Sequence, residues 1–365
     1  MSLLQYYNND TKTLIFPCHF NEELIKLPTD IKTLIFEGQY SEFNKSVDNL
    51  PKGIRYITFG FNFNQKVDKL PNLIKEIIFG EHFNQSVDKL PTDLINLTFG
   101  NNFDKKVDKL PKYLTHLTFG EFFNQSVDNL PKKLLHLTFG TSFNQNVEKL
   151  PNSITHLTFG FHFNQKVENL PNSIKYLTFG YNFNQKVDKL PNNLTHLNFG
   201  NWFDLSVDNL PNSLINLTFG ELFNQKVDNL PNSLTHLTFG NKFYQIVEKL
   251  PKSLKYLKFR EFYNLSVDHL PNNLTHLTFG NGFNQKIEKL PNSITHLTFG
   301  GLFNQSIDKL PENLTHLKIG INFNKNLENL PINLEELKIY KHQLNLLKKI
   351  PLNCVVVNLN DNILL

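Results

Sequence analysis

The sequence repeats every 20 residues, and this period decides what the chain can fold into. Between residues 51 and 331 the unit recurs without slippage, and fifteen copies of its Phe-Asn half run from Phe43 to Phe323. A more divergent sixteenth copy comes before them, and three extra residues within 37–42 separate it from the next copy. Regular repeats of this length predict a solenoid, in which each unit forms one coil and packs on its neighbours.

Six apolar positions in each unit predict the shape of one coil. Leu157 and Phe159 lie two residues apart, which is the period of a strand with one buried face, so His156 and Thr158 should point the other way. The glycine that follows recurs in 13 of 15 copies and predicts a turn with positive φ. A Leu-Pro pair ends every copy and predicts a corner, because proline donates no backbone hydrogen bond. In the copy at 151–170 the six positions are Ile154, Leu157, Phe159, Phe163, Val167 and Leu170.

A coil of 20 residues is too short to hold a strand, a corner, a full helix and a return. We therefore expect a mainly β, leucine-rich-repeat-like solenoid of about 16 stacked coils that share one parallel sheet, with an extended or short 3₁₀ segment opposite each strand. The chain contains no alanine, the best helix former, which also argues for little helix. Without bulky helices on the outer side, the solenoid should curve only weakly.

The same pattern predicts a single repeat solenoid over residues 1–365. Residues 1–16 form its N-terminal cap and first strand, residues 17–339 its repeats, and residues 340–365 its C-terminal cap. Caps are needed because the end coils of a solenoid would otherwise expose apolar faces.

Composition excludes several classes of function. A formal net charge of +4 over 365 residues is too small to indicate nucleic-acid binding. No apolar run approaches the roughly 18 residues of a membrane helix. Cys18 and Cys354 fall at opposite ends of the array, too far apart for a disulfide, and the N-terminus lacks a signal-peptide pattern. We therefore expect a reduced, intracellular and cytoplasmic protein without a cofactor.

Two polar columns recur at fixed positions in the unit. The Asn after the Phe occurs in 12 of 15 copies and predicts an asparagine ladder that satisfies backbone groups from coil to coil. The residue after the Val is acidic in all 15 copies, and adjacent lysines should compensate its charge. Calcium binding is the alternative for this acidic column, although the unit lacks the Gly-rich Asp loops of calcium-binding repeats.

A column of histidines lies on the outward side of the predicted strands. Eight of the chain's thirteen histidines occur here, and tyrosines occupy the position in other copies. Three interpretations remain open: the rings only cover the strands, they form part of a protein-binding face, or they form a metal ladder, although no second ligand lies at a local ligand spacing. Stacked histidines should have lowered pKa values, above all in the runs 116/136/156 and 276/296/316.

Variation among the copies points to residues that could provide specificity. The two positions after the Gly vary most, and loops on a rigid scaffold often carry function. Trp202 and Arg260 belong to residue types enriched at binding hot spots, although neutral drift explains the same variation. The residues that depart from the repeat between 198 and 265 are Asn198, Trp202, Leu205, Tyr244, Ile246, Lys258, Arg260 and Leu265.

The repeated Phe-Asn-Gln-x-Val and Leu-Thr-His-Leu-Thr-Phe-Gly segments resemble the FNIP repeat family, whose members are leucine-rich-repeat-like proteins of social amoebae and giant amoeba viruses. One departure is that Lys, Ser or Asn stands here where the family often has a proline after Phe-Asn-Gln. Some members carry an F-box and look like substrate receptors of ubiquitin ligases. Only about 13 residues precede the first repeat strand here, too few for an F-box.

These observations predict a non-catalytic scaffold that binds unknown proteins through the concave strand face and its adjoining loops as a monomer. The resemblance implies a recognition module related to F-box-linked receptors but lacking an F-box. If the source is a virus, we expect the protein to act in the host cytoplasm. The alternatives are a purely structural or self-associating rod and, third, metal binding by the His ladder. The predicted partner-binding residues are His116, His136, His156, Tyr176, His196, Trp202, His236, Tyr256, Arg260, His276, His296 and His316.

Overall fold

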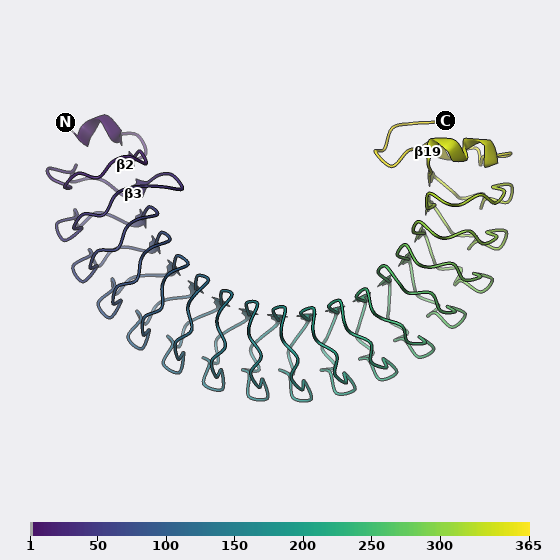
Figure 1. The fold of residues 1–365 in the computed structure, drawn as a ribbon, viewed down its shortest axis with the longest axis horizontal. Helices are drawn as coiled ribbons and strands as arrows, with labels where there is room; N and C mark the ends of the chain where they lie inside the picture. Colours follow the sequence, from purple (N-terminus) through teal and green to yellow (C-terminus); the bar gives the residue numbers. More distant parts are fainter. Residues whose placement is uncertain (1–2) are drawn as a thin grey trace. The chain divides into compact units, whose positions relative to one another are not determined.

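A computed structural model describes residues 3–365, so Met1 and Ser2 of the expected N-terminal cap lie outside the described part. The chain divides into two compact units that meet between Phe183 and Asn184. Within each unit, short coils follow one another and their strands line the inner side of the curve (Figure 1). The fold is therefore mainly β and leucine-rich-repeat-like, as the sequence predicts, and the only helices among the described residues are two 3₁₀ helices.

Strands are short because each coil contributes three or four residues to the sheet. In the first unit β2 to β10 pair in parallel and in register, and β1 pairs antiparallel with β2. The elements of this unit are η1 (Leu3–Tyr6), β1 (Tyr7–Asn8), β2 (Thr13–Phe16), β3 (Thr33–Phe36), β4 (Tyr56–Thr58), β5 (Glu76–Ile78), β6 (Asn96–Thr98), β7 (His116–Thr118), β8 (His136–Thr138), β9 (His156–Thr158) and β10 (Tyr176–Thr178).

The second unit has the same architecture. Its strands also pair in parallel, each residue lying opposite the residue one repeat later in all but the last pair. The elements of this unit are β11 (His196–Asn198), β12 (Asn216–Thr218), β13 (His236–Thr238), β14 (Tyr256–Lys258), β15 (His276–Thr278), β16 (His296–Thr298), β17 (His316–Lys318), β18 (Glu336–Lys338), η2 (Lys341–Leu346) and β19 (Val355–Val357).

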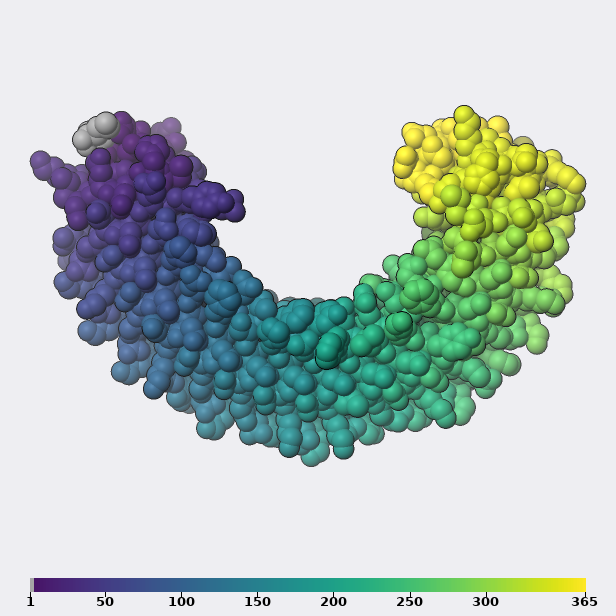
Figure 2. Space-filling model, viewed as in Figure 1, coloured from purple at the N-terminus to yellow at the C-terminus, as the bar shows by residue number. Residues whose placement is uncertain are grey.

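The six predicted apolar positions form the core of every coil. In the copy at 151–170 all six side chains are between 0 and 7% exposed. Successive coils of each unit pack directly on one another in the space-filling view (Figure 2). Since a coil has no core without its neighbours, burial of these side chains ties the stability of each coil to the next.

Aromatic stacking determines how the coils are spaced. Between the coils that begin at residues 131 and 151, ring centroids lie 4.1 Å apart in the His column, 5.7 Å in the first Phe column and 6.1 Å in the second. Between the coils that begin at 271 and 291 the corresponding distances are 4.2, 5.7 and 6.1 Å. The coils are therefore wedges, narrow on the strand side and wide in the core.

This wedge corrects the expectation of weak curvature. Each unit curves visibly, with its strands on the inner side (Figure 1). Strands pair at about 4.8 Å, whereas both Phe columns hold the coils farther apart. The stacked rings in the core thus bend each unit, an effect that bulky helices on the outer side would also produce.

The recurrent glycine also has a different role from the predicted one. Among the described glycines only Gly38 has a positive φ, so the repeated position does not need a left-handed turn. Instead, a Cβ at Gly160 would overlap the carbonyl of Gly140, and the same overlap recurs along the column. Glycine is required because two successive coils approach closely here.

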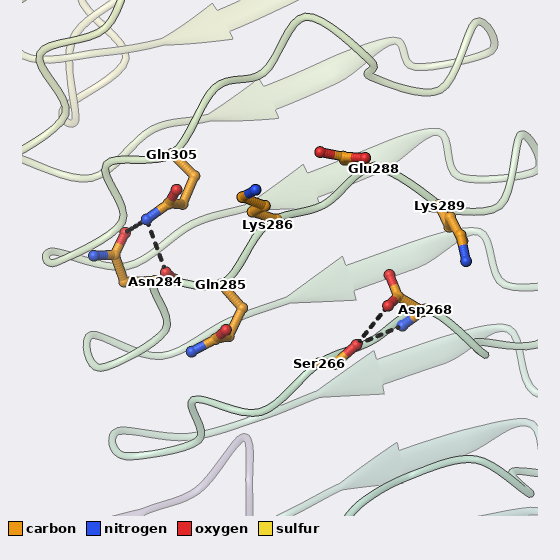
Figure 3. Close-up of a pocket in the computed structure, with 8 residues that line it drawn as sticks. All are labelled: Ser266, Asp268, Asn284, Gln285, Lys286, Glu288, Lys289 and Gln305. Atoms are coloured by element: carbon orange, nitrogen blue, oxygen red, sulfur yellow. Dashed lines mark hydrogen bonds between the residues drawn. The ribbon is translucent and has the colours of Figure 1, made fainter.

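The predicted asparagine ladder is present. The side-chain oxygen Oδ1 of Asn284 accepts a hydrogen bond from the backbone N–H of Asn304 at 2.9 Å and from Nε2 of Gln305 at 3.2 Å. The Gln305 amide also donates to the backbone carbonyl of Asn284 (Figure 3). Aspartate can replace the ladder residue, since Asp204 Oδ1 accepts the N–H of Asn224 at 2.8 Å.

The acidic column is compensated from the following coil. Lys69 reaches Asp48 at 2.8 Å and Lys149 reaches Asp128 at 3.0 Å. In other coils an asparagine donates instead, as Asn229 Nδ2 does to Oδ1 of Asp208. Many of the carboxylates in this column therefore have partners on the following coil. Among the described residues no group of three or more His, Cys, Asp or Glu side chains could hold a metal ion.

Short segments cover both ends of the array. At the N-terminal end β1 pairs antiparallel with β2. At the C-terminal end β19 follows β18 in parallel, and the last residues turn back so that Val356 N–H donates to the carbonyl of Leu365 at 3.0 Å. These segments occupy backbone groups that an open sheet edge would offer to another chain.

Removing residues 340–365 should make the protein associate. The deletion exposes the edge of β18 and the apolar face beneath it, which includes Leu337 and Ile339. We expect oligomers or aggregates by size-exclusion chromatography with light scattering, compared with the intact chain. A soluble, monomeric deletion variant would contradict the assignment of a cap.

Replacing Asn284 with Ala should lower the free energy of unfolding by about 1–3 kcal/mol, because the backbone N–H of Asn304 loses its acceptor in a part-buried site. Asn284→Asp is the matched control and should cost less, since Asp204 occupies the equivalent position. Guanidinium unfolding of the full chain measures both variants. Equal losses for Ala and Asp would show that the acceptor is not what stabilises the ladder.

Candidate functional site

The His column forms two runs of stacked rings on the inner strand face. Ring centroids of neighbours lie 4.1–4.3 Å apart, with planes within 27° of parallel. The structure thus brings most of the predicted binding residues together within each unit. The run of the first unit is His116, His136, His156 and Tyr176, and that of the second unit is His236, Tyr256, His276, His296 and His316.

A threonine just before the strand holds the histidine ring in place in every coil of the column except that of His136, which follows Leu135. In the coil of β15, Thr275 Oγ1 lies 2.9 Å from Nδ1 of His276, and it also donates to the carbonyl of Lys255 at 3.0 Å. The same Thr–His contact recurs before β16 and β17. Because Nδ1 is engaged, Nε2 is the nitrogen of these rings that remains for a ligand on the inner face.

Burial and neighbouring charge lower the pKa of several of these histidines. Burial is the main cause of the lowered pKa of His136, and the charges of His156 and His116 add to it. Burial and then neighbouring histidines likewise lower the pKa of His276 and His296. The predicted direction is therefore confirmed at these three positions. The lowered pKa favours the neutral form of these three rings, which reduces repulsion between stacked neighbours.

The geometry does not favour a metal ladder. The rings of His276 and His296 are 13° from parallel, so their edges face the same direction instead of converging on one point. A zinc ion needs ligands arranged as a tetrahedron around it. The stacked imidazoles can cover the strands or present nitrogen donors to a partner, but they do not form a chelate.

The two predicted loop residues lie apart. Trp202 is 51% exposed on the loop after β11, and Arg260 is exposed at the end of β14, three repeats later. Arg260 continues the outward line of Tyr256 in the His column. The structure therefore joins Arg260 to the predicted strip, whereas Trp202 stands separately at the edge of the same unit.

One exposed feature was not among the predicted site residues. The loop that follows β3 extends on the inner side of the first unit (Figure 1), and Tyr40 within it is 69% exposed, with its ring 5.7 Å from that of Phe61. Its signal in the sequence is the three extra residues within 37–42. An insertion into an otherwise strict repeat can only be accommodated in a loop.

The side of the second unit carries a polar hollow of about 530 Å³ (Figure 3). Ser266 Oγ donates to the carboxylate of Asp268 and accepts the N–H of the same residue. No histidine lines the hollow, and Lys286 and Glu288 leave it open and charged on both sides. The lining does not contain the nucleophile, base and orienting acid of a hydrolytic site.

Comparisons with known proteins agree with this architecture. The FNIP Repeat family matches in twelve overlapping segments that together span residues 43–341. The chain belongs to the FNIP repeat family. No curated protein matches the sequence. No helix among the described residues is long and apolar enough to span a membrane.

Solved structures place this FNIP repeat protein among leucine-rich-repeat solenoids. It is 40% identical to CroV588, a circular leucine-rich-repeat protein of a giant virus, with a TM-score of 0.73. The match covers 95% of this chain but only 62% of CroV588. YopM from Yersinia enterocolitica is 17% identical with a TM-score of 0.53, and covers 91% of this chain and 79% of its own. TLR13, solved with a single-stranded RNA, is 14% identical with a TM-score of 0.58. This match covers 90% of this chain and 60% of the TLR13 chain. The last two likenesses show the fold alone.

Acid should destabilise the protein through the stacked histidines. Their pKa is lowered in the folded state, so the associated stability is present above the unfolded value of about 6.5 and is lost as pH falls below it. We expect the guanidinium concentration at the midpoint of unfolding to decrease as the pH is lowered from about 7.5 to about 5.

The matched control is the triple variant His136→Tyr, His276→Tyr and His296→Tyr, because tyrosine already occupies this column in β4, β10 and β14. Its midpoint should change less over the same range. An identical pH dependence in both proteins would mean that other groups cause the acid sensitivity.

Proposed function

We propose that this FNIP repeat protein is a non-catalytic scaffold that binds other proteins on its inner strand face. Leucine-rich-repeat-like solenoids are typically protein-interaction modules without catalytic activity. The observation that supports this proposal most is the inner face itself, where ordered aromatic rings are presented on a rigid sheet. Rings held by neighbours lose little conformational entropy on binding, and partly exposed aromatic side chains supply contact area.

The covered ends of the array support this function over a self-associating rod. Rods that grow end to end by strand addition need free sheet edges. Here β1 occupies one edge, and the residues after β19 turn back along the other. We therefore propose a monomer whose binding surface lies along the strands. The resemblance to F-box-linked receptors implies a recognition role, and we include that role in the same proposal.

We further propose that the protein acts inside the cell, in the cytoplasm. Cys18 and Cys354 are both free thiols. Burial, with a smaller effect of Glu336, raises the pKa of Cys354 to about 11, so that this thiol stays protonated and unreactive. Free thiols fit a reducing compartment.

Proximity labelling in the native cells tests the inner face. The test variant carries His276→Asn, His296→Asn and His316→Asn, since asparagine already occupies this column in β6 and β12. The control variant carries Lys249→Asn, Lys289→Asn and Lys309→Asn at the exposed position before each Leu-Pro corner, where Asn229 occurs naturally.

We expect the test variant to lose labelled partners and the control variant to keep them, with circular dichroism confirming that both remain folded. Identical partner sets for the wild type and the test variant would refute the inner face as the binding surface.

A further inference from the structure

Strand β14 differs from the other strands in what it presents on the inner face. Tyr256 and Lys258 are both exposed, and Arg260 is exposed two residues later, whereas Leu257 and Phe259 between them are buried. Alternation along the strand therefore places Tyr256 and Lys258 on the same face, and the exposed Arg260 follows two residues after Lys258, just past the end of the strand. Together with Phe262, which is 60% exposed on the following loop, they are called the basic-aromatic strip below.

The two cations of the strip have no carboxylate partner. Lys258 lies in register with Thr238 and Thr278 on the neighbouring strands. Arg260 stands in the column that is glycine in both adjacent coils. Neither cation forms an ion pair in the part of the chain that the structure describes. By contrast, Lys338, in the same column as Lys258, pairs with Asp361.

The charged groups around the strip do not neutralise its excess of positive charge. Glu261 follows Arg260, and its carboxylate, which accepts a hydrogen bond from Nδ2 of Asn281 at 2.8 Å, offsets one positive charge. Lys255 adds a further exposed cation just before the strand. The rings of His236 and His276 flank Tyr256 at 4.2 Å, and burial lowers the pKa of both histidines. At neutral pH the strip is therefore a local positive site between uncharged neighbours.

Apolar surface accompanies these cations. Lys242 Nζ lies 5.6 Å from the ring centroid of Phe262. On the preceding coil Tyr244 and Ile246 are 54% and 61% exposed, at positions that are Asn and usually Lys or Ser in other copies. A partner that pairs with Arg260 would therefore find the exposed ring of Phe262 two residues further along the chain.

These departures weaken the array where they occur. Six successive junctions join the coils that begin at residues 191 to 311. Five of them have two hydrogen bonds outside the sheet, one from the strand-end loop and one from the ladder. At the junction between the coils that begin at residues 231 and 251 the described residues make neither bond. Tyr244 has no amide oxygen for the ladder, and Arg260 has a Cβ where close approach of the coils calls for glycine.

Loss of local fit together with gain of exposed functional groups is typical of binding sites. We propose that the basic-aromatic strip binds an acidic segment of a protein partner. Lys258 and Arg260 would pair with its carboxylates, and Phe262 would contact an apolar side chain of the same segment. This inference rests on the proposed function and names the chemistry of the partner.

Charge distribution favours a peptide over a nucleic acid. A nucleic acid strand needs cations that follow successive phosphates across several coils. Here the corresponding positions on both sides of Lys258 and Arg260 are threonine and glycine. A short acidic segment needs only the two or three cations that one coil provides.

A peptide titration tests the inference. The probe is a fluorescein-labelled peptide of about eight residues, mostly glutamate with one Phe and one Leu, and its comparison is the same peptide with Gln in place of Glu. The test variant carries Lys258→Thr and Arg260→Gly, each of which restores the most frequent residue of its column, so the fold should be retained or strengthened. The control variant carries Lys318→Thr, in the same column three coils away.

We expect the acidic peptide to bind the wild type and the control variant, and to bind the test variant about tenfold or more weakly in fluorescence anisotropy. Equal binding of the Gln peptide, unchanged affinity of the test variant, or no binding of the acidic peptide would each overturn the inference. Stronger, Lys258- and Arg260-dependent binding of an oligouridine RNA would assign the strip to nucleic acid instead.

The two proposals fail separately. If the acidic peptide binds through the strip while the His-to-Asn variant keeps all labelled partners, the inner His face is refuted and the strip stands. If partners depend on the His face but the peptide does not bind, only the strip is refuted.

Discussion

Face-to-face stacking of phenylalanine rings is the interaction on which the rest of this structure depends. Within a coil the two Phe columns touch, as Phe159 and Phe163 do with centroids 3.7 Å apart, and between coils each column continues at 5.6 to 6.1 Å. The rings bury the apolar surface that a coil of 20 residues cannot bury alone. They also hold the cores farther apart than the strands, which bends each unit and brings the His rings on the inner face into contact.

Polar contacts follow the repeat set by these rings. The glycine column allows the strand-end loops to approach, and the asparagine column receives the N–H of the following coil. Many of the acidic residues receive a cation or amide from the same direction. Each column thus provides one kind of contact between neighbouring coils, and this contact recurs along the array. A substitution in one column therefore affects one junction and leaves the others unchanged, which is why departures from the repeat can be interpreted individually.

Much of this could be predicted because the pattern is local. Alternation of Leu157 and Phe159 with His156 and Thr158 fixed the buried and outward faces of the strand, and the stacked column at His136 follows from the 20-residue period. The curvature and the role of Gly160 could not be predicted, because both depend on distances between coils that are absent from the pattern within one unit. For the candidate site, the sequence identified Arg260 as unusual, but only the register of Lys258 against Thr238 and Thr278 shows that these cations lack partners.

The junction between the coils that begin at residues 231 and 251 affects how the second unit comes apart. In a linear array each coil is held only by nearest neighbours, so the weakest link decides where separation begins. Here that link keeps its strand pairing and stacked rings but lacks both supporting hydrogen bonds. We therefore expect the coils of this unit to separate first at this junction. A ligand that contacts both the coil of Tyr244 and that of Phe262 would hold the two coils together. Binding of such a ligand would then raise the resistance of the unit to unfolding.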